Sequence, residues 1–315
     1  PRSTHCISSA ASDVYKRQTK GVLMRISYEF FPPADLDFTR VASHFNELKG
    51  FQPAFLSVTF GAGGSPEDKS LGLIKELQAH TNVNVAAHLT LVGKSIDDID
   101  TIIQKLKILN VKTIVAIRGD SPNNLFVPAK KGFINTSDFV AYLKRNGFEV
   151  CVSAYPEPHP ESEGFDFDLQ LLQNKVEAGA SKAITQFCFD LPQFDRLVES
   201  IAQRNIDVKL IPGIMPVASI KNILRMADRC GIVIPKSVTN RFNGDLDEDI
   251  KAAKELCLEQ IEYLQNLGLN DFHFYTLNRS DLTYSILKEI TANEIHEHKS
   301  RNAKSWQEER IKIRN

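Results

Sequence analysis

The feature that most constrains the fold is an alternation that starts at Met24, in which a short apolar run is followed by a longer amphipathic stretch. Short apolar runs rich in β-branched and aromatic residues are typical of buried parallel strands. Runs of this kind predict strands at 25–31, 54–61, 84–91, 113–120, 149–156, 183–190, 207–216 and 271–278. Apolar residues at helical spacing predict helices between them, at 37–49, 66–80, 95–109, 137–146, 168–178, 191–204, 219–230 and 247–267.

Eight rounds of strand and helix favour a closed parallel barrel over an open doubly wound sheet. An open sheet that binds a dinucleotide usually carries a Gly-x-Gly-x-x-Gly turn after its first strand. Here the first strand runs into Phe31-Pro32-Pro33, and the nearest glycine-rich turn, 61–66, follows the second strand. We therefore predict an α/β fold, a single (β/α)8 TIM barrel with a short decoration at 231–245 after the seventh unit.

Two segments lie outside the alternation. Residues 1–23 are rich in Ser and Ala and lack the apolar region of a signal peptide, so we interpret them as a non-native or disordered leader before a barrel at 24–290. Residues 291–315 are polar and mixed in charge, and we interpret them as a C-terminal tail.

Composition excludes several classes of protein. The net charge is −1 at pH 7, without the basic face expected of a nucleic-acid or membrane-surface protein. No apolar stretch reaches the roughly 18 residues that a membrane span needs. The cysteines form no Cys-x-x-Cys pair, and reduced core thiols in a cytoplasmic protein are the simplest interpretation.

Polar residues gather where the predicted strands end, which is the edge at which this fold builds its active sites. They are Glu29, Thr59, His88, Arg118, Asp120, Tyr155, Glu157, His159, Gln186, Asp190, Tyr275, Asn278 and Arg279. Buried polar groups are costly unless they are paired or used, so we predict a site at this end of the barrel.

Glu29 lies between Tyr28 and Phe30, where desolvation would raise the pKa of its carboxyl and suit it to be a general acid. A structural pair with a neighbouring arginine is the alternative. Arg118 and Asp120 share a strand face, so a salt bridge between them is the alternative to a role in the site.

Three further side chains allow more than one interpretation. His88 and His159 have no companion ligands, so we predict no metal site, and we expect His88 to bond to a cofactor or a core carbonyl. Lys175 lies on a predicted helix, where a solvated position is the default; at the barrel mouth it would bind phosphate.

Nine segments in order resemble one family over roughly 24–287. They are YEFFPP (28–33), SVTFGAGG (57–64), AHLT (87–90), IRGD (117–120), AYPEPHPE (154–161), KVEAGA (175–180), AITQFCFD (183–190), IPGIMPV (211–217) and DFHFYTLNR (271–279). The chain resembles the bacterial 5,10-methylenetetrahydrofolate reductases. This resemblance implies an FAD-dependent cytoplasmic enzyme, a homo-oligomer, in which NADH or NADPH reduces the flavin before methylenetetrahydrofolate takes the hydride.

The resemblance also implies roles for individual residues. Glu29 matches the general acid that protonates N10 of the folate, and Asp120 matches the carboxylate near flavin and pterin. The substrate contacts would be Glu29, Asp120, Gln186, Asn222 and Arg279. The flavin contacts would be Thr59, His88, Arg118, Gly119, Asp120, Thr136, Tyr155, His159, Ser162, Asp168 and Lys175.

The match departs from the family pattern at a few positions. Met226 stands where an aromatic residue often packs on the nicotinamide nucleotide, and Asn222 stands in place of a glutamine. Leu171 and Asn174 occupy positions that often contact flavin. Two other interpretations remain: a proline-dehydrogenase-like FAD barrel, and a barrel that binds flavin or folate without catalysis.

Overall fold

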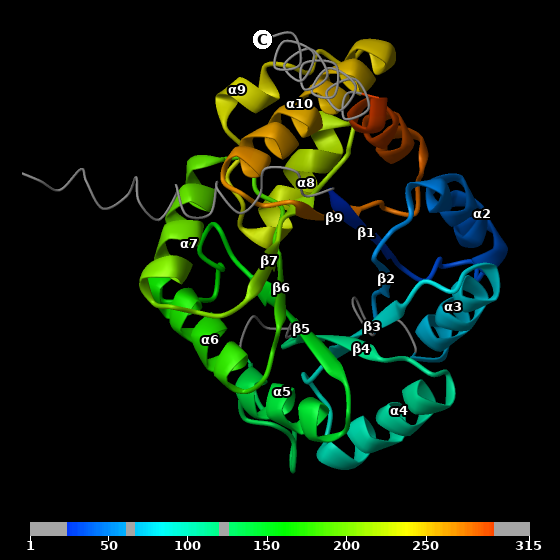
Figure 1. Cartoon of the computed structure of the whole chain (residues 1–315), viewed down its shortest axis with the longest axis vertical. Helices are drawn as coiled ribbons and strands as arrows, with labels where there is room; N and C mark the ends of the chain where they lie inside the picture. Colours follow the sequence, from blue (N-terminus) through cyan, green and yellow to red (C-terminus); the bar gives the residue numbers. More distant parts are fainter. Residues whose placement is uncertain (1–23, 61–66, 120–125, 293–315) are drawn as a thin grey trace, which may run out of the picture.

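Parallel strands form an inner ring in the computed structural model, which describes residues 24–60, 67–119 and 126–292 (Figure 1). The strands are β1 (Arg25–Phe30), β2 (Phe55–Val58), β3 (Val85–Thr90), β4 (Thr113–Ile117), β5 (Glu149–Ala154), β6 (Lys182–Thr185), β7 (Lys209–Ile211), β8 (Gly213–Ile214) and β9 (Asp271–Tyr275). Their order around the ring is β7-β6-β5-β4-β3-β2-β1-β9-β8.

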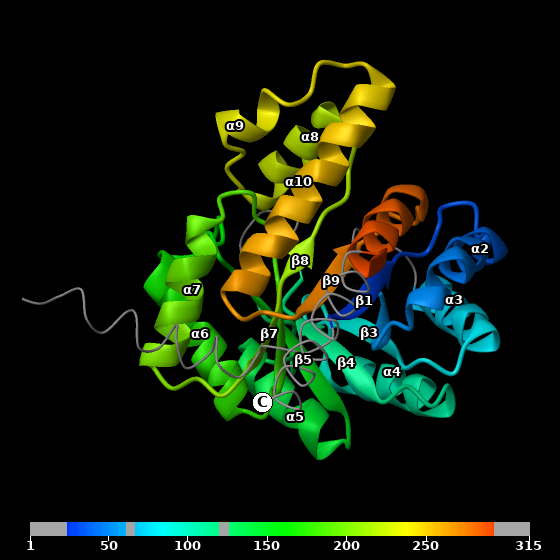
Figure 2. The same ribbon diagram turned by 45° about the horizontal axis from the view of Figure 1, so that its top comes forward.

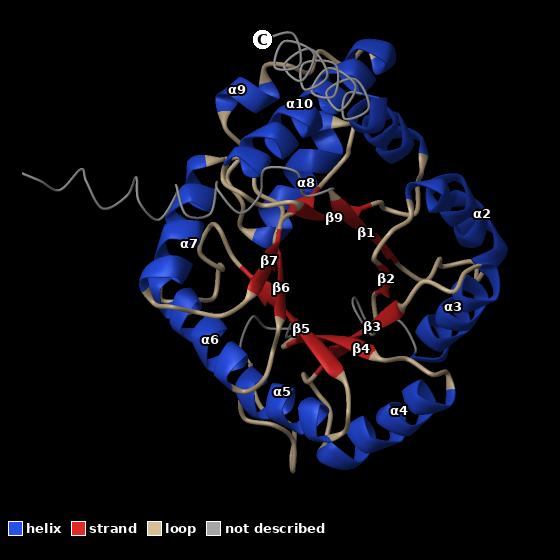
Figure 3. Ribbon diagram, viewed as in Figure 1, coloured by secondary structure: helices blue, strands red, loops and turns tan. Residues whose placement is uncertain are grey.

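Helices surround this ring on the outside (Figure 3). They are α2 (Phe38–Leu48), α3 (Glu67–His80), α4 (Ile96–Ile108), α5 (Thr136–Arg145), α6 (Phe165–Glu177), α7 (Pro192–Gln203), α8 (Ile220–Cys230), α9 (Lys236–Thr239) and α10 (Leu246–Asn266), with a 3-10 turn η1 (Lys49–Phe51). Residues 281–292 are also helical. No helix in these described ranges combines the length and the apolar content that a membrane crossing requires.

The ring closes where the predicted seventh strand is divided at Pro212. Proline has no backbone N–H, so it cannot continue the ladder of hydrogen bonds. Before it, β7 pairs with β6; after it, β8 pairs with β9. The carbonyl of Pro212 accepts a hydrogen bond of 2.8 Å from the backbone N–H of His273 on β9. The two halves of the predicted seventh strand therefore pair with different neighbours, β6 and β9, and this closes the barrel.

The apolar core has three parts. The largest lies between the strands and the surrounding helices, where residues such as Phe45, Ile103 and Phe139 are fully buried. A smaller group, which includes Phe55 and Val115, fills the inside of the barrel. The third part, the upper core, includes the inward-facing side chains of α8, α9 and α10. It consists of Phe187, Phe189, Met215, Val217, Ile223, Ala227, Ile232, Val238, Phe242, Ala253 and Leu256. Figure 2 shows these three helices standing above the barrel rim.

The predicted fold is confirmed: a parallel barrel with alternating helices, decorated after the seventh unit by α9 and its flanking turns. Ser95 caps the N-terminus of α4, since its hydroxyl accepts from the backbone N–H of Asp98 at 3.2 Å. The helix at 281–292 was missed. Its buried residues Thr283, Ile286, Leu287 and Ile290 follow helical spacing, so the signal was there to be used.

A substitution at Gly213 tests how tightly the divided strand is packed. A Cβ atom there would lie 2.5 Å from the carbonyl oxygen of Thr185 and 2.5 Å from Cε2 of Tyr275. We expect Gly213→Ala to lower the free energy of unfolding by roughly 1–3 kcal/mol, measured by urea denaturation. Gly50→Ala is the control, because a Cβ there meets nothing within 4 Å. Equal midpoints for the two variants would contradict the packing described.

Candidate active site

Strand register brings five polar side chains to one place inside the barrel. Glu29 on β1 pairs in register with Ser57 on β2 and with Tyr275 on β9. Ser27, two residues before Glu29, pairs with His273. Residues two apart on a strand share a face, so all of these side chains point into the barrel.

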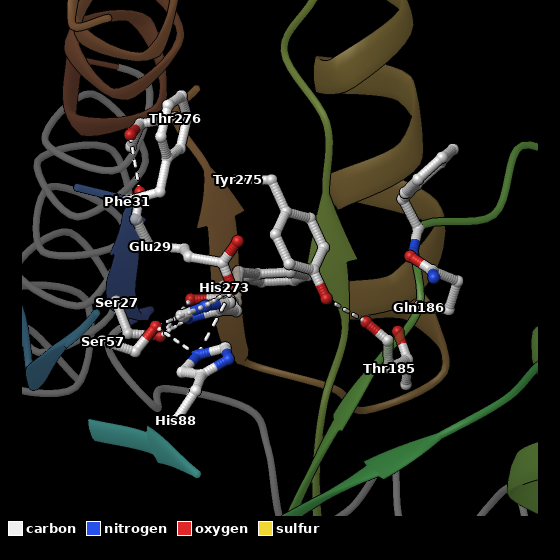
Figure 4. Close-up of polar contacts among 12 residues, drawn as sticks. Ser27, Glu29, Phe31, Ser57, His88, Thr185, Gln186, His273, Tyr275 and Thr276 are labelled. Carbon is white, nitrogen blue, oxygen red and sulfur yellow. Dashed lines mark hydrogen bonds and ion pairs between the residues drawn. The ribbon is translucent and has the colours of Figure 1, made fainter. Parts of the chain in front are cut away.

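The carboxylate of Glu29 faces two imidazoles (Figure 4). Its Oε2 atom is 3.4 Å from Nε2 of His88 and 3.9 Å from Nε2 of His273. The Glu29 side chain keeps 19% of its surface exposed, whereas that of His273 has 0%. The hydroxyl of Thr276 donates to the backbone carbonyl of Glu29 at 2.6 Å and holds the end of the strand. Glu29 is thus anchored below and open on one side.

The pKa of Glu29 is lowered, which is opposite to the prediction. Burial alone would raise the pKa of this carboxyl. Interactions with the imidazoles of His273 and His88 favour the carboxylate and outweigh the burial. The prediction was wrong because it considered the aromatic neighbours on the strand and not the two histidines across it. In the free site Glu29 is therefore a carboxylate.

A cavity of about 430 Å³ opens over the carboxyl ends of the strands, with Glu29 in its wall. The predicted site residues that line it are Glu29, His88, Arg118, Gly119, Thr136, Tyr155, His159, Ser162, Asp168, Lys175 and Gln186. Apolar side chains of Val115, Ile117, Val152 and Ile184 line it as well. The cavity thus combines an apolar surface with polar groups drawn from several strands and helices.

Lys175 lies in this cavity with only 7% of its surface exposed, so the default interpretation of a solvated lysine was wrong. Its ammonium donates to the carbonyl of Ser153 at 2.9 Å. Burial lowers the pKa of Lys175 to about 8, against the attraction of Asp168. Asp168 in turn accepts from the backbone N–H of His159 at 2.8 Å and from the hydroxyl of Ser162 at 3.0 Å. This part of the cavity wall is therefore polar and hydrogen-bonded, and it includes the buried cation Lys175.

Arg118 forms an ion pair of 2.6 Å with Glu161, a residue that the sequence reading did not single out. The guanidinium also lies over the ring of Phe126, 5.9 Å from its centroid. Asp120, the alternative partner of Arg118, lies outside the described residues. Arg118 is thus held at the cavity edge by a loop that follows β5.

Among the described residues to which the resemblance assigns a ligand contact, Thr59, Asn222 and Arg279 do not line the cavity, nor do the strand-end residues Glu157, Asp190 and Asn278. Thr59 is partly buried just beyond β2, and Asn222 is exposed on α8. Arg279 is 78% exposed and pairs with Asp281 at 3.5 Å. Their predicted ligand contacts stay predictions, as does the role of Asp120. Among the described residues, no group of three or more His, Cys, Asp or Glu side chains is placed to hold a metal ion.

Ser27, Ser57 and His273 contact the Glu29 region or each other, and the sequence reading did not propose them. A signal was available. Each lies on a predicted strand, and the even spacing of Ser27 from Glu29 and of His273 from Tyr275 places them on the inner face.

Comparison with known proteins agrees with this geometry. Residues 15–291 match the family model described as methylenetetrahydrofolate reductase. The chain belongs to the methylenetetrahydrofolate reductase family. It is 36% identical over 269 residues to the 5,10-methylenetetrahydrofolate reductases of Pectobacterium carotovorum and Escherichia coli, which covers 84% of this chain and 89% of each relative.

A solved structure also shares the fold. It is an uncharacterized protein from Clostridium thermocellum, described as binding two copies of 5-methyl-5,6,7,8-tetrahydrofolic acid. The TM-score is 0.60 at 14% identity, over 88% of this chain and 98% of that one. At 14% identity this similarity shows a shared barrel fold alone.

The depressed pKa of Lys175 predicts a pH-dependent stability. An ordinary lysine titrates near pH 10.4 in the unfolded chain, so between about pH 8 and that value the unfolded state binds more protons than the native state. The stability cost of Lys175 is therefore complete below about pH 8 and disappears as the pH rises.

We expect the free energy of unfolding of Lys175→Met, relative to the unsubstituted protein, to fall by roughly 2–3 kcal/mol as the pH rises from 7 to 10.5. Urea denaturation of the ligand-free proteins at a series of pH values measures it. A difference that stays constant with pH would contradict the assigned pKa.

Proposed function

We propose that this protein reduces 5,10-methylenetetrahydrofolate to 5-methyltetrahydrofolate, using bound FAD and a hydride from NADH or NADPH. The observation that carries the proposal is a carboxylate, Glu29, in the wall of a cavity that also holds the buried cation Lys175, in a chain that belongs to the reductase family. A single cavity at the barrel mouth would take the nicotinamide nucleotide and the folate in turn, which implies ping-pong kinetics.

The residues of the cavity fit a flavin. Val115, Val152 and Ile184 offer an apolar surface for a planar ring system. Thr136 and Ser162 supply hydroxyls at the cavity wall, and Lys175 supplies a positive charge suited to a phosphate. When bound, FAD supplies the hydride-transfer chemistry, whereas the protein contributes binding, orientation and protons.

Glu29 would hold the proton that N10 of the folate receives. In the free site the pKa of Glu29 is low, and its remaining 19% exposure keeps the carboxylate in contact with water. A ligand packed over that opening removes the water, and desolvation then raises the pKa of the carboxyl. We infer that Glu29 takes up a proton as the folate binds, so that its acid form exists when it is needed. Gln186, at the end of β6 and in the cavity wall, would bind the pterin through its amide.

We also propose a cellular compartment for this protein. The described cysteines, Cys151, Cys188, Cys230 and Cys257, are all free, which supports a reducing compartment such as the cytoplasm. Assembly as a homo-oligomer stays a prediction.

The decisive test measures the two half-reactions separately without oxygen. Purified protein, reconstituted with FAD if necessary, should be yellow, should bleach with NADH or NADPH, and should be reoxidised by methylenetetrahydrofolate. A protein that takes up no FAD would overturn the proposal, as would a reduced flavin that the folate does not reoxidise.

Substitution of the acid should affect one half-reaction only. Glu29→Gln keeps the shape of the side chain and removes the proton donor. We expect flavin reoxidation by the folate to slow by roughly 10²–10⁴-fold, because that is the usual contribution of a general acid, while reduction by NADH stays within about threefold. Stopped-flow absorbance of the flavin measures both rates. An equal loss in both half-reactions would show that Glu29 is not the acid.

Lys175 should contribute to flavin binding through its charge. Loss of a hydrogen bond to a charged group costs about 1.5–3 kcal/mol, so Lys175→Met should weaken FAD binding by roughly 10–150-fold. Titration of the ligand-free protein, followed by the quenching of flavin fluorescence, measures the Kd. Lys182→Met is the matched control, because Lys182 pairs with Glu149 at the opposite end of the barrel. Equal FAD affinity in both variants would remove Lys175 from the proposed phosphate site.

A further inference from the structure

Two histidines and one serine form a hydrogen-bonded cluster directly under Glu29 (Figure 4). The Ser57 hydroxyl oxygen is 3.1 Å from Nε2 of His88 and 3.3 Å from Nε2 of His273. The same two nitrogen atoms are those that face Oε2 of Glu29. A serine hydroxyl carries a single hydrogen, so it can donate to only one of the two imidazoles. It can donate to one imidazole while it accepts from the other, and the two histidines then have different roles.

The lower end of the cluster decides which histidine plays which role. The Ser27 hydroxyl donates to the carbonyl of Phe272 at 3.2 Å and lies 2.7 Å from Nδ1 of His273. With the Ser27 hydrogen assigned to that carbonyl, the Nδ1 atom of His273 is the donor to Ser27. A neutral His273 is then protonated on Nδ1 and presents a lone pair at Nε2.

The remaining protons follow from this tautomer. The lone pair on His273 Nε2 accepts the Ser57 hydrogen, and the Ser57 oxygen is then left to accept from His88. His88 must therefore carry its proton on Nε2, the atom that is 3.4 Å from Glu29. The direction of donation runs from His88 through Ser57, His273 and Ser27 to the Phe272 carbonyl. Each hydrogen bond in this series has one donor and one acceptor.

The surroundings of His273 make this arrangement rigid. The ring of Phe55 stacks on the imidazole with centroids 5.6 Å apart and planes at 14°. The ring of Tyr275 meets it edge-on at 5.4 Å. His273 is fully buried, and the series of bonds ends on a backbone carbonyl. Its geometry suits a fixed support for Glu29 rather than a path that delivers protons from solvent.

We propose that Ser57 and His273, with Ser27 as their anchor, are positioning residues that keep the transferable proton on Glu29. The inference rests on the proposed function, in which Glu29 is the acid. By occupying Nε2 of His273, the Ser57 hydroxyl prevents that nitrogen from taking the proton as an imidazolium. Without the hydroxyl, His273 is a competing base 3.9 Å from the acid.

Nitrogen NMR of protein labelled with 15N-histidine tests the tautomers, in the FAD-loaded protein without folate. His88→Asn and His273→Asn assign the two signals among the chain's 8 histidines. We expect His273 protonated on Nδ1 alone and His88 on Nε2 alone near neutral pH. In Ser57→Ala, Nε2 of His273 should gain a proton. A wild-type His273 protonated on Nε2, or a Ser57→Ala spectrum without change at His273, would overturn the proposal.

The half-reactions test the consequence for catalysis. Ser57→Ala should slow flavin reoxidation by methylenetetrahydrofolate by roughly 10–100-fold and leave reduction by NADH within about threefold. Thr113→Val is the matched control, since Thr113 is also buried on a strand but donates to Glu149 at the other end of the barrel. It should leave both rates unchanged.

The possible results distinguish a failure of the positioning role from a failure of the proposed function. If Glu29→Gln loses folate reduction but Ser57→Ala keeps the rate of the Thr113→Val control, the proposed function stands and the positioning role is overturned. If Ser57→Ala slows both half-reactions equally, the hydroxyl supports the structure and the inference is again overturned. The tautomers are measured without folate, so they test the hydrogen-bond series whether or not the protein reduces folate.

Discussion

In-register pairing of β1 with β2 on one side and β9 on the other is the constraint on which the site depends. A parallel barrel directs every second side chain inward, and the register decides which inward side chains share a level. Here it places Glu29 level with Ser57 and Tyr275, and Ser27 level with His273. A slip of one residue on any of these strands would move its polar side chains out of the barrel. The division of the seventh strand at Pro212 protects this register, because it lets β8 bond to β9 while β7 stays with β6.

The stability of the fold and the chemistry of the site act against each other in this barrel. A lysine whose pKa burial lowers to about 8 and a carboxylate surrounded by imidazoles would both be less costly in water. Each is tolerated because neighbours offset part of the cost: the carbonyl of Ser153 for Lys175, and His88 and His273 for Glu29. Such groups are typical of a surface prepared for a charged or polar ligand rather than of a core selected for stability.

The barrel and most of its helices could be predicted from the sequence because apolar periodicity and capping residues are local signals. The lining of the cavity by residues such as Arg118 and Gln186 was also within reach, through the rule that sites lie at the carboxyl ends of strands. The pKa of Glu29 was not, since its direction depends on His273, some 240 residues away in the chain and adjacent only once the ring closes. Nor was the partner of Arg118, because the position of Glu161 is set by the path of a loop.

The upper core at α8, α9 and α10 is packed separately from the core around β1. These helices pack on Phe187, Phe189 and Met215, which lie beyond the strands, and share little with the core around β1. Met226 and Cys230 of α8 nevertheless border the same cavity as Glu29. Substitutions on the cavity-facing side of α8 can therefore change the cavity wall without touching Glu29 and the side chains that contact it.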